Sequence, residues 1–71
     1  MPFSTLTDPI DLARAQAALE TAWAEIRPAL SQDIYERERT RLAYAVAALA
    51  SLAEDEDDLA RRAVERYRSQ S

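Results

Sequence analysis

Hydrophobic residues recur at every third or fourth position in the first part of the chain, which is the spacing of an amphipathic α-helix. The pattern predicts a helix over residues 9–27, with Asp8 as its N-cap and Pro9 in the first helical position. Pro28 ends it, because the residue before a proline disfavours helical backbone angles. The predicted core stripe comprises Leu12, Ala15, Leu19, Ala22 and Ile26, with Trp23 beside it as a core anchor.

A second helix is predicted over residues 31–53, and its two halves differ in character. The first half interleaves acidic and basic residues, whereas the second half is rich in alanine. The start is open between Pro28 itself and Ser31 as N-cap. Glu38 occupies a stripe position, so the charged half is expected either to project past the body of the protein or to meet a polar partner. The predicted stripe comprises Tyr35, Leu42, Ala45, Leu49 and Leu52, widened by Ile34, Val46 and Ala53.

An acidic run over residues 54–58 marks the start of a third helix, predicted over residues 56–68. Carboxylates suit the positive end of a helix dipole, and Asp55 is the expected N-cap. The arginines of this helix come later, near its negative end. Two i,i+4 ion pairs are predicted: Asp57–Arg61 and Asp58–Arg62. The predicted apolar face comprises Leu59, Ala60, Ala63, Val64 and Tyr67.

Short connections between three such helices favour antiparallel neighbours, so an all-α three-helix bundle is expected. Composition agrees, because the chain is rich in alanine, lacks glycine and is 31% charged. The 71 residues are expected to form one small domain, with an extended lead-in at 1–7 and a frayed tail at 69–71. A core this small is marginal, and homodimerisation is one way in which it could be completed.

The residue types that are missing argue against catalysis. The chain has no histidine and no cysteine, and its basic residues are all arginine, so the usual general bases, nucleophiles and Schiff-base formers are absent. Without glycine there is no phosphate-cradling loop and no sharply turned calcium loop. The acidic run is explained by its position at a helix start. We therefore expect no enzyme activity, no cofactor and no bound metal.

Membrane insertion is not expected either. The first residues lack the basic and apolar regions of a signal peptide. The longest apolar run, residues 42–53, is far shorter than the roughly 20 residues that span a bilayer. A cytoplasmic location is expected by default.

One flank of the second helix offers a candidate partner surface. Its residues are mostly apolar and small, and they lie beside the predicted core stripe rather than on it. We expect a non-catalytic protein–protein interaction module that binds a second copy of itself, as a homodimer, or another protein. The predicted interface comprises Ala43, Tyr44, Ala47, Ala48 and Ser51.

The alternative is a small nucleic-acid-associated regulator that uses arginines on two helix faces. Its candidate contacts are Arg37, Arg41, Arg62 and Arg66. Two features disfavour it. The net charge is −4, and neighbouring acids are predicted to neutralise the arginines locally through Glu36–Arg39 and Glu38–Arg41 i,i+3 pairs. A phosphate-tracking surface does not usually carry its own counter-charges.

Three segments, Ala18–Trp23, Arg39–Ala43 and Asp58–Ala63, resemble short uncharacterised α-proteobacterial helical proteins. The resemblance covers most of residues 12–67. Such proteins often have a glycine in the second turn, which this chain lacks. The resemblance implies a small helical fold without an assigned activity, so it adds no site and no substrate.

Overall fold

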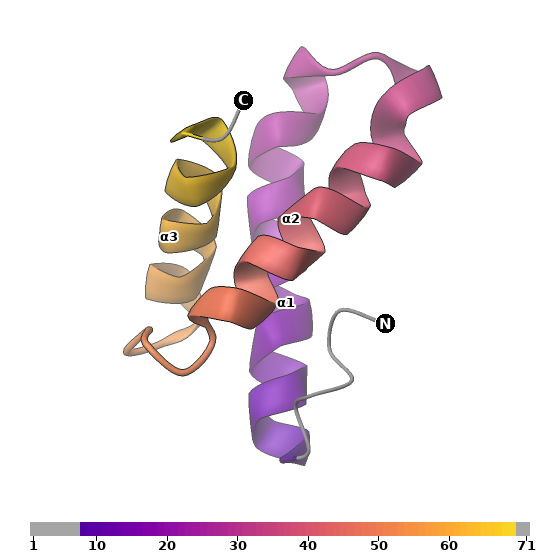
Figure 1. Cartoon of the computed structure of the whole chain (residues 1–71). Helices are drawn as coiled ribbons and strands as arrows, with labels where there is room; N and C mark the ends of the chain where they lie inside the picture. Colours follow the sequence, from indigo (N-terminus) through magenta and orange to yellow (C-terminus); the bar gives the residue numbers. More distant parts are fainter. Residues whose placement is uncertain (1–7, 70–71) are drawn as a thin grey trace.

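Three helices make up most of residues 8–69, the part of the chain that the computed structural model describes (Figure 1). No strand is present in that range. Two short 3-10 turns, Arg27–Ala29 and Gln32–Ile34, link the first helix to the second. The helices are α1 (Pro9–Ile26), α2 (Tyr35–Leu49) and α3 (Glu56–Ser69). The predicted all-α three-helix bundle is thus confirmed, while the predicted lead-in at 1–7 and residues 70–71 of the predicted tail lie outside the described residues.

The first and third helices run side by side in the same direction, and α2 crosses in front of α1 in the opposite direction and ends near the start of α3 (Figure 1). Both α1 and α3 contact α2. Consecutive helices are therefore antiparallel, as short connections favour. The most extensive packing is between α1 and α3, which are not neighbours in the sequence. Each helix thus contacts both of the others around one core.

The boundaries of α1 follow from the residues that flank it. The Asp8 carboxylate accepts a hydrogen bond from the Ile10 amide at 2.8 Å, which satisfies one of the free N–H groups of the first turn. Pro9 occupies the first turn, where its missing N–H costs nothing. The regular helix ends at Ile26, and Arg27 continues into the 3-10 turn that contains Pro28.

The second helix is shorter at both ends than the predicted 31–53. Residues 32–34 form a 3-10 turn, so α2 begins only at Tyr35, and Ser31 makes no side-chain cap. At the other end the regular helix stops at Leu49. The amides of Leu52 and Ala53 both donate to the Leu49 carbonyl, at 3.0 and 3.2 Å, which closes a turn.

The early end of α2 has an electrostatic reason. A helix continued to residue 53 would bring the acidic run against its own negative end. Stopping at Leu49 leaves residues 50–55 for the chain to reverse, and it places the acids at the positive end of α3. Leu52, predicted as a core residue, is consequently carried outward by the turn and is 64% exposed.

The core lies where the three helices meet. Leu42, Val46 and Leu59 are completely buried, and small alanines on α1 and α3 allow those two helices to approach closely. The predicted apolar face of α3 is confirmed in full, since all five of its members are buried. Along α1, Leu12 is only half-buried. The buried core comprises Ala15, Ala18, Leu19, Ala22, Trp23, Ile26, Leu42, Ala43, Ala45, Val46, Leu59, Ala60, Ala63, Val64 and Tyr67.

Trp23 is a core anchor, as predicted. Its side chain is 8% exposed, and its ring meets the half-buried Tyr35 ring edge-to-face, with 5.5 Å between the ring centres. Edge-to-face packing suits the charge distribution of aromatic rings. This aromatic pair holds the first turn of α2 against α1.

Candidate interaction surface

An exposed strip runs along the side of α2 that faces away from the other two helices. It consists of Tyr44, Ala47, Ala48, Ser51 and Leu52, and it is called here the α2 outer face. Tyr44 is 57% exposed and Leu52 is 64% exposed, while Ala47 is half-buried and the remaining two are exposed. The three- and four-residue spacing of these positions keeps them on one side as α2 passes into its closing turn. The resulting surface has a large apolar side chain at each end and small side chains between them.

Four of the five predicted interface residues belong to this strip, and Ala43 does not. Ala43 is only 6% exposed and packs into the protein's own core, so it has little surface left for a partner. The reason is that α2 lies across both α1 and α3 and therefore buries a wide arc of its circumference. Leu52, by contrast, joins the exposed strip although its spacing placed it in the core.

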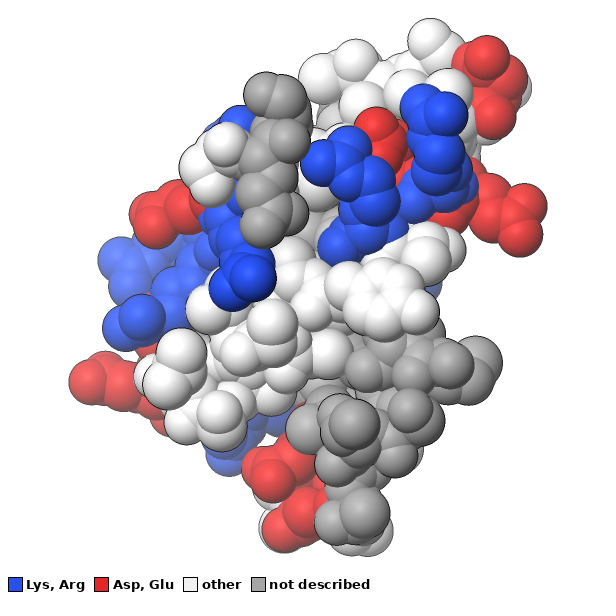
Figure 2. Space-filling view, in the orientation of Figure 1, with Lys and Arg blue, Asp and Glu red and all other residues white. Residues whose placement is uncertain are grey.

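A shallow, open hollow of about 510 Å³ continues this surface toward the start of α2. The Tyr44 ring forms one side of it, and the other lining groups are polar or charged. The view that faces α2 shows an uncharged band, with arginines and carboxylates side by side above it and further carboxylates toward its lower edge (Figure 2). The residues that line the hollow are Asp33, Glu36, Arg37, Thr40, Arg41 and Tyr44.

The charged half of α2 is built into the bundle rather than projecting from it. Glu38 is 8% exposed, and both of its carboxylate oxygens accept from Nη1 of Arg41, at 3.0 and 3.2 Å. The Arg41 guanidinium also lies 5.1 Å from the centre of the Tyr67 ring on α3. The predicted Glu38–Arg41 pair is confirmed, and the polar partner expected for this half lies within the same chain.

Burial of Tyr67 raises the pKa of its hydroxyl, and the nearby negative charge of Glu38 raises it further. A hydrogen bond between the Tyr67 and Glu38 side chains acts in the same direction. Burying a carboxylate is costly unless its oxygens are satisfied. Arg41 and Tyr67 together satisfy Glu38, which explains why a charged residue can occupy a core position.

Arg39 reaches α1 instead of pairing within its own helix. It forms an ion pair with Glu20, and its guanidinium carbon lies 5.9 Å from the centre of the Trp23 ring. The predicted Glu36–Arg39 pair is therefore wrong. A partner nineteen positions away in the sequence cannot be found from helical spacing, because only the fold brings the two residues together.

The four arginines of the nucleic-acid alternative differ in whether they form ion pairs. Arg41 is held by Glu38, and Arg62 donates through Nε to Asp58 at 2.8 Å. Arg37 and Arg66 are exposed and form no ion pair within residues 8–69. Two of the four candidate phosphate contacts are thus already neutralised by carboxylates of the protein itself.

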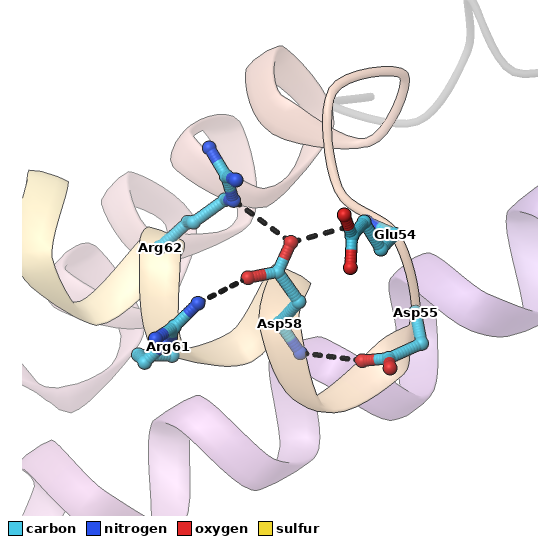
Figure 3. Close-up of polar contacts among 5 residues, drawn as sticks. All are labelled: Glu54, Asp55, Asp58, Arg61 and Arg62. Atoms are coloured by element: carbon cyan, nitrogen blue, oxygen red, sulfur yellow. Dashed lines mark hydrogen bonds and ion pairs between the residues drawn. The ribbon is translucent and has the colours of Figure 1, made fainter.

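The acidic run caps α3 (Figure 3). The Asp55 carboxylate accepts from the Asp58 amide at 2.8 Å, and the Asp58 carboxylate accepts from the Glu54 amide at 3.0 Å. This reciprocal arrangement satisfies free N–H groups on both sides of the helix start. Asp58 also binds Arg61 and Arg62. The predicted Asp58–Arg62 pair is confirmed, whereas Arg61 pairs with Asp58 rather than with Asp57.

These contacts hold the pKa of Asp58 well below its ordinary value of 3.8, at about 2. The hydrogen bond from the Glu54 amide contributes most, followed by those from the two arginines. A structural role at the start of α3 therefore accounts for the presence of Asp55 and Asp58. Among residues 8–69, no group of three or more acidic side chains is arranged to hold a metal ion.

Comparison of the chain with protein-family models found no match, and neither did comparisons with curated proteins and with solved structures. The resemblance to short α-proteobacterial helical proteins therefore stays a prediction. None of the helices within residues 8–69 combines the length and the apolar character that crossing a bilayer requires.

Proposed function

We propose that the protein is a non-catalytic helical interaction module that associates with a second copy of itself through the α2 outer face. The observation that carries the proposal is the exposure of Tyr44 and Leu52 on one side of α2. Within residues 8–69 the only other large hydrophobic residue exposed to this degree is Ile10. Tyrosine is favoured at protein interfaces because a rigid ring supplies apolar contact area while its hydroxyl stays hydrated.

The small residues between Tyr44 and Leu52 support the same interpretation. Ala47, Ala48 and Ser51 let the axis of another helix approach closely, since interaxial distance is set by the side chains at the contact. The area is modest. One face of α2, about 22 Å long, buries far less than the roughly 800 Å² per partner of a stable interface. The expected association is accordingly weak, with a Kd in the micromolar range or above.

Sedimentation equilibrium from about 1 µM to about 500 µM tests this proposal. The unmodified protein is expected to pass from monomer to dimer across that range. Ala48→Arg should shift the midpoint at least about tenfold upward, because its long side chain holds the two copies apart. Ala24→Arg is the matched control, since Ala24 is also exposed in the last turn of its helix but lies on α1.

Either of two results contradicts the proposal. A strict monomer at every concentration excludes self-association. A dimer that Ala48→Arg and Ala24→Arg affect equally moves the interface away from the α2 outer face. The predicted cytoplasmic location is a separate part of the proposal, to be tested by fractionation of the native cells.

The second candidate, a nucleic-acid-associated regulator, rests on Arg37 and Arg66, which are exposed and form no ion pair within residues 8–69. Because Arg41 and Arg62 hold carboxylates, few positive charges remain for a phosphate backbone. Binding to duplex DNA at low salt, weakening steeply as salt is added, is the discriminating result. Absence of binding at low salt eliminates this candidate.

A further inference from the structure

The connection between α2 and α3 contains no residue that forces a helix to stop. Residues 50–55 include neither proline nor glycine, and no residue within 8–69 has a positive φ angle. Many helices end at a glycine in the left-handed conformation, which reverses the chain. Ala50 instead keeps right-handed helical angles, with φ −57° and ψ −37°. The end of α2 is therefore not fixed by a local backbone feature.

Helical hydrogen bonding enters this connection from both sides. The Ala53 amide donates to the Leu49 carbonyl at 3.2 Å, which is the four-residue spacing of an α-helix. The Leu59 amide donates to the Asp55 carbonyl at 2.9 Å with the same spacing. Glu54 is the single position between these two spans. A change of backbone angles confined to the connection would thus join α2 and α3 in one helix.

We propose that two copies of the protein exchange α3, with α2 and α3 of each copy joined in one continuous helix. Residues 35–69 would then form a rod about 52 Å long, whose α3 part packs against α1 and α2 of the other copy. Exchange of an identical element between protomers is a recognised route to a dimer. The inference goes beyond the proposed function, because the exchanged dimer uses the core of the bundle and not the α2 outer face.

The interface of the exchanged dimer already exists within one chain. All five residues of the apolar face of α3 are buried, and the packing of α3 against α1 is the most extensive in the bundle. After exchange the same contacts form between copies, including the Arg68–Glu25 ion pair and the Arg41 guanidinium over the Tyr67 ring. The core is equally satisfied in both forms, so the connection decides between them.

Several features of the connection favour the continuous helix. The last carbonyls of α2 and the first amides of α3 would satisfy each other, which replaces the cap that Asp55 provides. Ala50, Leu52 and Ala53 are residue types with high helix propensity. Leu52, which is 64% exposed in the closed turn, would return to the core-facing stripe that its spacing from Leu49 predicts.

The acidic run acts in both directions. It is unfavourable at the negative end of α2, but a continuous helix has no end at that place. The electrostatic reason for stopping at Leu49 therefore applies only while α3 folds back. Against exchange, Glu54 and Asp58 would become like-charged neighbours at i,i+4 spacing. The closed form consequently prevails in dilute solution, and exchange requires a high protein concentration.

Cross-linking between α1 and α3 reads out exchange directly, because the chain has no native cysteine. Glu25→Cys and Arg68→Cys, combined in one chain, replace an exposed ion pair that joins the two helices. A short bismaleimide then links the two thiols within one chain in the closed form and between chains after exchange. The variant is unfolded in denaturant and refolded at about 1 µM or about 1 mM, since mass action favours the dimer at the higher concentration.

A dimer band on a denaturing gel is expected after the concentrated refolding and not after the dilute one. Insertion of a triglycine segment between Ala53 and Glu54 should abolish this band, because it interrupts the continuous helix and lets α3 fold back. The same insertion between Leu30 and Ser31, in the connection that does not take part in exchange, is the control and should leave the band unchanged.

The outcomes separate this inference from the proposed function. Links between chains that only the insertion at 53–54 removes support exchange of α3. Links confined to single chains in every preparation, or an equal effect of the two insertions, overturn it. Ala48→Arg, which tests the α2 outer face, is expected to leave the exchanged dimer intact, because exchange does not use Ala48. Failure of either proposal therefore leaves the other standing.

Discussion

The Arg41 guanidinium lies 5.1 Å from the centre of the Tyr67 ring, and this contact joins α2 to α3. A cation above an aromatic face is attracted by the ring's electron density. The same guanidinium holds the buried Glu38, so one arginine neutralises a core carboxylate and covers an aromatic ring of the neighbouring helix. The charged half of α2 is thereby part of the bundle.

Removal of the Tyr67 hydroxyl is expected to destabilise the protein. In Tyr67→Phe, Glu38 loses a hydrogen bond in a buried setting, at a cost of about 1 kcal/mol. In a domain of this size that corresponds to a drop in Tm of about 4–8 °C, measurable by circular dichroism. Tyr44→Phe is the control, because the Tyr44 ring is exposed and its hydroxyl is free to bond with water. Equal effects of the two changes would contradict the role assigned to the Tyr67 hydroxyl.

The end of α2 at Leu49 predicts unequal costs for two leucine truncations. Leu42→Ala removes a completely buried side chain and should cost about 2–5 kcal/mol in the free energy of unfolding. Leu52→Ala alters an exposed side chain and should stay within about 0.5 kcal/mol. Urea unfolding at low micromolar protein, followed by the fluorescence of the single tryptophan, measures both. A large cost for Leu52→Ala would favour the longer helix that the spacing predicts.

Loss of the α3 N-cap should weaken that helix. Asp55→Ala removes the acceptor of the Asp58 amide and is expected to cost about 1 kcal/mol. Asp55→Ser keeps a capping oxygen and should retain most of the stability. Hydrogen exchange would locate the effect, with the first turn of α3 exchanging faster in the alanine variant. Exchange that rises equally in α1 would point to a global cause instead.

Stability should depend on pH through Asp58. Its pKa is about 2 in the folded protein against 3.8 ordinarily, so its contacts stabilise the fold fully above pH of about 4. That contribution is lost as the pH falls from 4 toward 2, when the carboxylate becomes protonated. The difference in unfolding free energy between the unmodified protein and Asp58→Asn should therefore shrink over this interval. A difference that stays constant from pH 5 to 2 would exclude the effect.

Local sequence signals were sufficient for α1 and α3. Both begin at an aspartate cap, and both carry a regular apolar face that the structure buries. The ends of α2 were harder to predict, because residues 50–53 contain no helix breaker. It ends at Leu49 because the acidic run that follows is more stable at the positive end of α3 than at the negative end of α2.

The candidate surface was only partly predictable, because its limits depend on tertiary packing. Spacing along one helix indicates a stripe, but the width of the buried arc depends on how many neighbours that helix has. Since α2 contacts both other helices, Ala43 is buried although it lies outside the predicted stripe. Glu38 has the spacing of the stripe and is buried although it is charged. The Arg39–Glu20 pair depends likewise on tertiary structure, which local spacing does not encode.

The extensive packing of α1 against α3 has a consequence for biosynthesis. On the ribosome α1 and α2 are made first, and the alanine face of α1 then has no covering helix. The native core can close only after the 14 residues of α3 have been synthesised and released. Until then the nascent chain presents two amphipathic helices with exposed apolar sides, which is the kind of segment that chaperones bind. Folding of the bundle is thus expected to be completed only after α3 has left the ribosome, in one step that requires all three helices.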